Sequence, residues 1–200
     1  MRVLIVYAHP KSDSYNAAIK AKVVERVEAA QAEYRLIDLY ALNYAPVLSA
    51  QELTFYEDTQ RNQKGQEQHC EDVRWCDTLI FVYPTWWYGL PAILKGWLDR
   101  VLVPGLAFEL PDRDGGNIRP GLTHIKRLAV FTTCGASWWL TRMIGAPGRR
   151  TILRGVRLLC AKRCRTAFAA HYSMDSATTA SRARHLQRVE ARMDRFLSGA

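Results

Sequence analysis

Five short and nearly continuous apolar runs recur along the chain, and polar or turn-forming segments separate them. Most of the runs are rich in β-branched residues. Runs of this length and composition are typical of strands that are buried on both faces, as in a parallel sheet. The pattern predicts strands at residues 2–8, 35–40, 78–83, 127–133 and 165–171.

Between these runs, apolar residues recur every three or four positions, which predicts amphipathic helices. Residues 12–14 supply N-cap candidates for the first helix, and Ser49 with Glu52 fits a capping box for the second. The turn chemistry of residues 108–123 predicts a small hairpin. The predicted helices run from residue 14 to about 32, from 49, over 66–76, from 91, and over 137–144, 147–162 and 177–197. The apolar stripe of the last one is Ala183, Leu186, Val189, Met193 and Phe196.

Strands that alternate with helices make an α/β fold whose parallel strands are joined by right-handed crossovers. A chain of 200 residues, 48% of them apolar, can bury one core without disulfides or metals. We therefore expect a single domain over residues 1–200. The expected fold is a flavodoxin-like, doubly wound sheet of five parallel strands in the order 2-1-3-4-5, with helices on both faces.

The formal net charge of +9 is concentrated in the last third of the chain. Residues 1–141 contain 15 Lys and Arg against 16 Asp and Glu, whereas residues 142–200 contain 13 against 3. Such a one-sided field attracts nucleic acid, anionic lipid or a phosphorylated ligand, although arginines at helical spacing more often form a solvated face. The arginines of the last predicted helix are spread around it, so we expect no sequence-specific binding of nucleic acid.

No apolar run is long enough to span a membrane, and no signal-peptide pattern opens the sequence. We therefore expect no membrane span and no secretion. The five cysteines form no CxxC motif, and their odd number fits reduced thiols and a cytoplasmic location. The scattered cysteines and histidines indicate no metal site.

The segments after the first, third and fourth predicted strands meet at one edge of such a sheet, where doubly wound folds bind ligands. The first segment, residues 9–16, contains neither a GxGxxG fingerprint nor a P-loop motif. It offers an imidazole, hydroxyls, an amide and the free N–H groups of a helix N-terminus. These groups either bind a phosphate or form a plain polar loop with a helix cap.

Three consecutive aromatic residues, Trp86, Trp87 and Tyr88, follow the third predicted strand. Neither a helical nor a strand period buries all three, so they line a pocket for a planar ligand or form a dimer interface. Trp138 and Trp139 cover either the ligand or a dimer contact. The small residues at 132–137 allow backbone N–H groups to approach the edge of a ring.

Three motifs stand at these strand ends. They are Ala8-His9-Pro10 with Ser14-Tyr15-Asn16, the run YPTWWYGLPAILKGWLDRV at residues 83–101, and Thr132-Thr133-Cys134-Gly135. Together they resemble the NAD(P)H:quinone oxidoreductase (DT-diaphorase) family, a group that includes potassium-efflux accessory flavoproteins. The middle run is long and specific, and the resemblance covers residues 1–136.

The resemblance implies a flavodoxin-like fold that binds FAD or FMN, and a homodimer with flavin sites at its interface. It also implies two-electron reduction of a quinone or similar acceptor, with NAD(P)H as co-substrate. It assigns the flavin phosphate to His9, Ser14, Tyr15 and Asn16. It assigns further cofactor contacts to Pro84, Thr85, Trp86, Trp87, Tyr88, Thr132, Thr133, Cys134 and Gly135.

Two features depart from the family pattern. Cys134 stands where the family usually has glycine, and we interpret it as a small residue in a tight turn. The Tyr and His that assist hydride transfer in the animal enzymes have no counterpart, because the matching positions fall near Leu140 and Ala146. We therefore assign no catalytic side chain, and we expect the backbone N–H groups of residues 133–135 to stabilise charge on the reduced flavin.

The preferred hypothesis is a flavoenzyme in which NAD(P)H and a quinone use the same pocket in turn. One alternative is a flavodoxin-type electron carrier, although such carriers are usually acidic and this chain is basic. The other is a flavin-binding regulatory subunit of a transport system. Oxidation of NAD(P)H in the presence of a quinone separates the enzyme from both alternatives.

Overall fold

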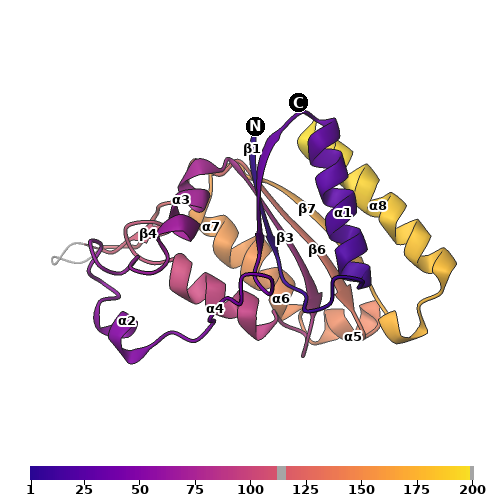
Figure 1. The fold of residues 1–200 in the computed structure, drawn as a ribbon, viewed down its shortest axis with the longest axis horizontal. Helices are drawn as coiled ribbons and strands as arrows, with labels where there is room; N and C mark the ends of the chain where they lie inside the picture. Colours follow the sequence, from indigo (N-terminus) through magenta and orange to yellow (C-terminus); the bar gives the residue numbers. More distant parts are fainter. Residues whose placement is uncertain (112–115, 199–200) are drawn as a thin grey trace.

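A five-stranded parallel sheet forms the centre of the computed structural model, which describes residues 1–111 and 116–198 (Figure 1). The strand order is β2-β1-β3-β6-β7. This is the predicted order 2-1-3-4-5, because β4 and β5 form a separate hairpin. The strands of the main sheet are β1 Arg2–Tyr7, β2 Glu33–Asp38, β3 Thr78–Thr85, β6 Arg127–Cys134 and β7 Arg165–His171.

Helices cover both faces of the sheet. They are α1 Tyr15–Ala29, α2 Ala50–Thr54, α3 Glu67–Trp75, α4 Ala92–Val101, α5 Trp138–Met143, α6 Pro147–Arg150, α7 Arg157–Leu159 and α8 Thr179–Leu197, with the π-helix η1 Thr151–Val156 and the 3-10 helix η2 Met174–Ser176. The predicted doubly wound α/β fold is confirmed.

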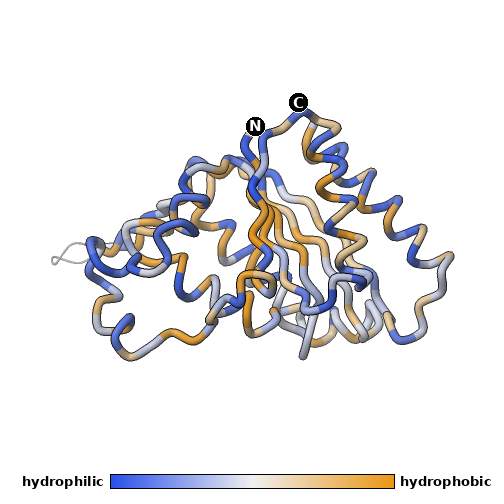
Figure 2. The backbone as a smooth tube through the Cα atoms, in the orientation of Figure 1, coloured by the Kyte–Doolittle hydropathy of each residue, from blue (hydrophilic) through white to orange (hydrophobic). Residues whose placement is uncertain are grey.

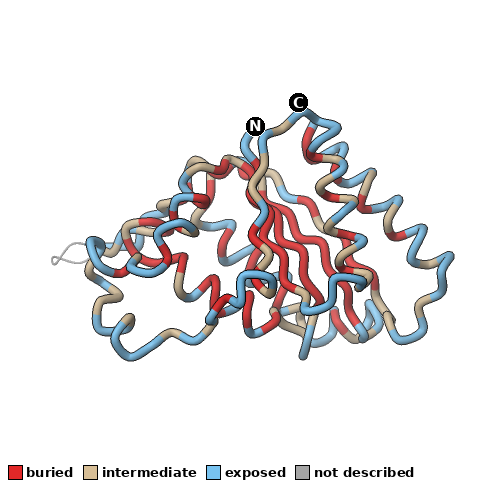
Figure 3. Tube along the Cα trace, in the orientation of Figure 1, coloured by how far each residue is buried: buried red, intermediate tan, exposed pale blue. Residues whose placement is uncertain are grey.

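Alternate residues of each strand face two separate apolar cores. Val3 and Ile5 of β1 pack in one core with the apolar stripes of α1 and α8. Leu4 and Val6 pack in the other core with residues of α3, α4 and η1. Figure 2 shows the strands as the apolar centre of the molecule, and Figure 3 shows that they are buried. Burial on both faces explains why the strands are continuous apolar runs.

Several element boundaries differ from the prediction. The first helix ends at Ala29 instead of 32, because Gln31 has a positive φ of 51°. The second strand lies two residues earlier than expected, in parallel register with β1. The third strand continues beyond Tyr83, because Pro84 and Thr85 still pair with residues of β6.

The helical segment predicted over 147–162 is wrong in two respects. Its middle is the π-helix η1, and it ends at Leu159. Cys160 takes an extended conformation and forms a bridge with Leu122, which stops the helix.

The predicted stripe of the closing helix is wrong at one position. Ala183 is exposed and His185 is buried in its place. His185 can be buried because its Nδ1 lies 2.9 Å from the Tyr15 hydroxyl, at the start of α1, and forms a hydrogen bond with it.

Two local predictions are confirmed. Ser49 and Glu52 form a capping box at the start of α2. The strands β4 Phe108–Glu109 and β5 Arg119–Pro120 pair antiparallel, as expected of the hairpin, and residues 112–115 of that prediction lie outside the described residues.

Within residues 1–111 and 116–198, no helix is both long and apolar enough to cross a membrane. All five cysteines are buried free thiols. No group of three potential metal ligands occurs in this part of the chain.

Candidate functional site

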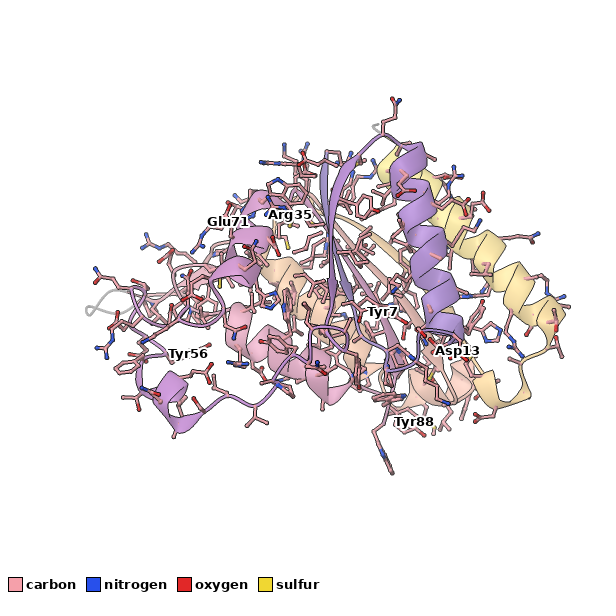
Figure 4. All side chains as sticks on the ribbon, viewed as in Figure 1. Tyr7, Asp13, Arg35, Tyr56, Glu71 and Tyr88 are labelled. Carbon is pink, nitrogen blue, oxygen red and sulfur yellow. The ribbon has the colours of Figure 1, made fainter. Side chains whose placement is uncertain are left out.

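The loops after β1, β3 and β6 surround a cavity of about 790 Å³ at the carboxyl edge of the sheet. Asp13 and Tyr88, which are labelled in Figure 4, mark two of these loops at the same end of the molecule. We call this the C-edge cavity. Its lining residues are His9, Tyr15, Asn16, Pro84, Thr85, Trp86, Trp87, Tyr88, Thr133, Cys134, Gly135, Ala136, Met174 and Asp175.

Eleven of the thirteen site residues expected from the sequence line this cavity, and Ser14 and Thr132 do not. Ser14 is the N-cap of α1, and its hydroxyl accepts a hydrogen bond from the Ala17 N–H. Thr132 is buried, with its hydroxyl 2.9 Å from that of Thr85. Both residues therefore hold neighbouring segments in place.

The start of α1 presents polar groups to the cavity. Its N-cap satisfies one backbone donor, and the N–H groups of Tyr15 and Asn16 make no backbone hydrogen bond within the described residues. The free N–H groups of a helix N-terminus favour an anion. His9 lies beside them, and burial lowers its pKa, so the ring is neutral at pH 7.

Asn16 is a buried residue with one satisfied and one unsatisfied group. Its Nδ2 donates to the Thr133 hydroxyl at 2.9 Å, whereas its Oδ1 has no partner among the described residues. A buried amide oxygen without a partner costs free energy, so it favours a ligand that donates a hydrogen bond.

The aromatic loop is a tight turn. The Gly89 N–H donates to the Trp86 carbonyl at 2.9 Å, and the two residues between them, Trp87 and Tyr88, both have positive φ, 48° and 61°. Positive φ at both central positions is the geometry of a type I′ turn, which bulky residues adopt only at a cost. As a result, the Trp87 side chain is 95% exposed at the mouth of the cavity.

The third loop closes the cavity with small residues. Cys134 is buried, and its sulfur lies 3.4 Å from the hydroxyl of Thr141, within α5. The backbone N–H groups of Gly135 and Ala136 make no backbone hydrogen bond within the described residues. They are therefore available to a ligand.

Sequence reasoning missed Met174 and Asp175 as lining residues, and it included Ala136 only within the loop of small residues at 132–137. Ala136 accepts a hydrogen bond from the Ser173 N–H, which brings the loop after β7 to the cavity. The residues of this loop form no motif. The one available signal in the sequence was that the loop follows β7, the strand next to β6.

Two buried histidines lie behind Tyr15. The rings of His171 and His185 have centroids 5.3 Å apart, and the Tyr15 hydroxyl bonds to His185 and donates to the Arg182 carbonyl. Burial lowers the pKa of His185 to about 4 and raises the pKa of Tyr15 to about 12. The cluster is therefore neutral at pH 7, and it fixes the Tyr15 ring at the wall of the cavity.

Comparison with known proteins agrees with this architecture. A family described as "Flavodoxin-like fold" matches residues 1–195. Ribosyldihydronicotinamide dehydrogenase (quinone) from Homo sapiens is 32% identical over 163 residues, which cover 74% of this chain and 69% of that protein.

Solved structures agree as well. An NAD(P)H:quinone oxidoreductase from Methanothermobacter marburgensis has a TM-score of 0.82 at 25% identity, and the match covers 96% of this chain and 97% of that one. An FMN-dependent NADH-azoreductase from Bacillus anthracis, in complex with FMN, has a TM-score of 0.76 at 14% identity, covering 98% and 99%, and shows the shared fold alone. The chain therefore belongs to the flavodoxin-like fold family and, within it, to the NAD(P)H:quinone oxidoreductases.

Proposed function

We propose that the protein is a flavin-dependent enzyme that transfers two electrons from NAD(P)H to a quinone or similar acceptor in the C-edge cavity. The observation that carries this proposal is the convergence of the three family motifs, which are far apart in the sequence, on one cavity. Its volume of about 790 Å³ lies in the range of cofactor sites.

The groups that line the cavity fit a flavin. Its phosphate would face the free N–H groups of Tyr15 and Asn16. The unpaired Asn16 Oδ1 is an acceptor for a hydroxyl or ring N–H, which a flavin has and a simple apolar ligand lacks. Trp86 and Tyr88 supply flat apolar surface for a planar ring, as cofactor pockets usually do.

When bound, a flavin would supply the redox chemistry, the transfer of two electrons between NAD(P)H and the acceptor. The chain's part is to orient the rings and to stabilise charge. The backbone N–H groups of Gly135 and Ala136 point to such a role, because fixed donors stabilise negative charge without titrating. No titrating side chain is assigned to hydride transfer, since Leu140 and Ala146 stand near the positions where the animal enzymes have Tyr and His.

We further propose that a second copy of the chain covers the mouth of the cavity. Trp87 is 95% exposed there, and α5 with its C-cap presents exposed apolar residues. These are Trp138, Trp139 and Met143 of α5 and the C-cap Ile144. Exposed apolar clusters of this kind mark interfaces. Sedimentation equilibrium should give a dimer, and Trp139→Glu should shift it toward the monomer.

Steady-state kinetics test the proposed reaction. If NAD(P)H and quinone use one cavity in turn, double-reciprocal plots of rate at several quinone concentrations should be parallel. Trp87→Ala should lower kcat/KM for both substrates about tenfold, the equivalent of about 1.4 kcal/mol of lost ring contact. Its flavin content should fall less than its turnover, because the flavin phosphate is held elsewhere.

Leu158→Ala, which truncates another exposed apolar residue that does not line the cavity, is the control and should keep full turnover. Intersecting plots would argue for separate binding sites.

A further inference from the structure

The sheet has a free edge at β7. This strand is last in the sheet order and pairs only with β6 among the described residues. The Arg165 N–H donates to the Lys126 carbonyl at 2.9 Å, on the side of β6. Because backbone groups alternate in direction along a strand, Thr166, Phe168 and Ala170 direct their N–H and C=O groups away from the sheet.

A groove runs along this free edge. Two cavities of about 400 and 370 Å³ share Arg149, Leu153 and Thr166. Together they extend from Arg165, the first residue of β7, to Tyr172, which follows its last residue. One wall comes from α5, α6 and η1, and the other from the end of α8. We call these two cavities the edge groove. No residue lining the edge groove also lines the C-edge cavity, and Trp138, at one end of the groove, belongs to the proposed dimer contact.

The edge groove is strongly cationic. Seven arginines line it and no acidic residue does. They are Arg142, Arg149, Arg150, Arg154, Arg165, Arg192 and Arg195. Within the described part of the chain none of them forms an ion pair; the salt bridges of α8 run from its acidic residues, Glu190 and Asp194, to Lys22 and Arg26 of α1.

Part of this charge is held in place. Arg165 donates to the carbonyls of Ser198 at 2.9 Å and Arg195 at 2.8 Å. The Arg149 guanidinium lies 4.6 Å from the centroid of the Phe168 ring. Neither Arg149 nor Arg165 has an anionic partner among the described residues, so both charges are available to an external anion.

We propose that the edge groove binds an extended acidic segment of another protein, which adds to β7 as a further strand. Main-chain hydrogen bonds to the free edge of β7 would align the segment. Successive side chains of an added strand point to opposite faces, where they would meet arginines from α6 and η1 on one side and from α8 on the other. A nucleic acid duplex also carries negative charge, but it presents no peptide groups to a strand edge.

Fluorescence anisotropy of the full-length protein tests this proposal. The probe is a fluorescein-labelled peptide of eight residues, built from Glu, Asp and Val. Arg154→Glu and Arg192→Glu, one on each wall, should each raise its Kd about fivefold. Arg184→Glu is the matched control: this arginine is exposed on α8 outside the edge groove and should change Kd less than twofold.

A second peptide separates strand addition from simple charge attraction. It has the same sequence with alternate backbone nitrogens methylated, which removes hydrogen-bond donors and keeps the charge. Its Kd should be at least about fivefold higher, because several main-chain bonds are lost. Addition of the unmethylated peptide should also shift the amide resonances of Thr166 and Phe168.

Each of three results would overturn the proposal: the methylated peptide binds as tightly as the parent, Arg184→Glu weakens binding as much as Arg154→Glu, or oligothymidylate of equal charge binds as tightly as the peptide. Any one of them would make the edge groove a general anionic-ligand surface. Circular dichroism of each variant establishes that its fold is intact.

Discussion

At the residue scale, Asn16 links the fold to the proposed chemistry. It is buried between α1 and β6, it bonds to Thr133, and its remaining oxygen has no partner among the described residues. A buried acceptor without a hydrogen bond destabilises the protein that has no ligand bound. A ligand that donates a hydrogen bond to this oxygen removes that cost. The position therefore favours ligand binding over stability.

Asn16→Ala should weaken flavin binding tenfold to a hundredfold, which corresponds to the loss of about 1–3 kcal/mol for one buried polar contact. Equilibrium dialysis of the apoprotein against FMN and FAD measures the change. Asn62→Ala is the control. Asn62 is also buried with an unpartnered Oδ1, but it bonds to the carbonyls of Tyr56 and Pro104, away from the C-edge cavity. It should lower stability and leave flavin affinity unchanged, and equal losses in both variants would contradict the assignment.

At the element scale, caps and apolar periodicity predicted most helices and strands. Ser14 and Ser49 begin α1 and α2 as expected, because a hydroxyl N-cap is a local signal. Long-range pairing is not local: the extension of β3 past Pro84 depends on β6, and the end of α7 depends on Leu122. Met174 and Asp175 were missed for the same reason, since tertiary contact alone brings their loop to the cavity.

The contact between α6 and the aromatic loop gives a prediction at this scale. The Gly148 N–H donates to the Tyr88 carbonyl at 3.2 Å, and a Cβ at Gly148 would lie 3.0 Å from the Gly89 carbonyl carbon. Gly148→Ala should therefore displace the turn, cost about 1–3 kcal/mol of unfolding free energy and lower turnover.

Gly155→Ala is the matched control on the same helical segment, because a Cβ there meets open space. It should leave turnover unchanged and not lower stability. Urea unfolding and kcat/KM check both variants. Equal behaviour of the two would show that the close approach of Gly148 is unimportant.

The packing of α1 against α8 through Tyr15, His171 and His185 predicts a pH dependence of stability. In the unfolded chain a histidine binds its proton near pH 6.5, whereas His185 in the fold does so near pH 4. The unfolded state therefore binds more protons between these values. The free energy of unfolding should fall as the pH decreases from about 6.5 to about 4, by about 3 kcal/mol from His185.

Burial also lowers the pKa of His171, which adds to this slope. His185→Gln should remove the larger share of the dependence, as measured by urea unfolding at pH 7.5, 6 and 5. His124→Gln, made outside the cluster, should keep it. If the free energy of unfolding of the His185 variant changes with pH as much as that of the wild type, the pH dependence does not originate in this cluster.

At the scale of the whole molecule, the sheet places the aromatic C-edge cavity and the cationic edge groove on different parts of the surface. The C-edge cavity lies at the carboxyl ends of the central strands, and the edge groove follows the outermost strand β7. The sequence predicted the first from motifs at strand ends. It located the charge of the second only as an excess in residues 142–200, because the separation of acidic from basic side chains on α8 depends on the packing of α1.

The measurement that tests the central claim most directly is anaerobic reduction of the flavin-loaded protein. Addition of one equivalent of NADH or NADPH should bleach the visible flavin absorbance, and one equivalent of a quinone should then restore it. Trp87→Ala, loaded to the same flavin content, should show both steps more slowly. A wild-type protein that retains no flavin, or whose bound flavin is bleached by neither nucleotide, would contradict the account.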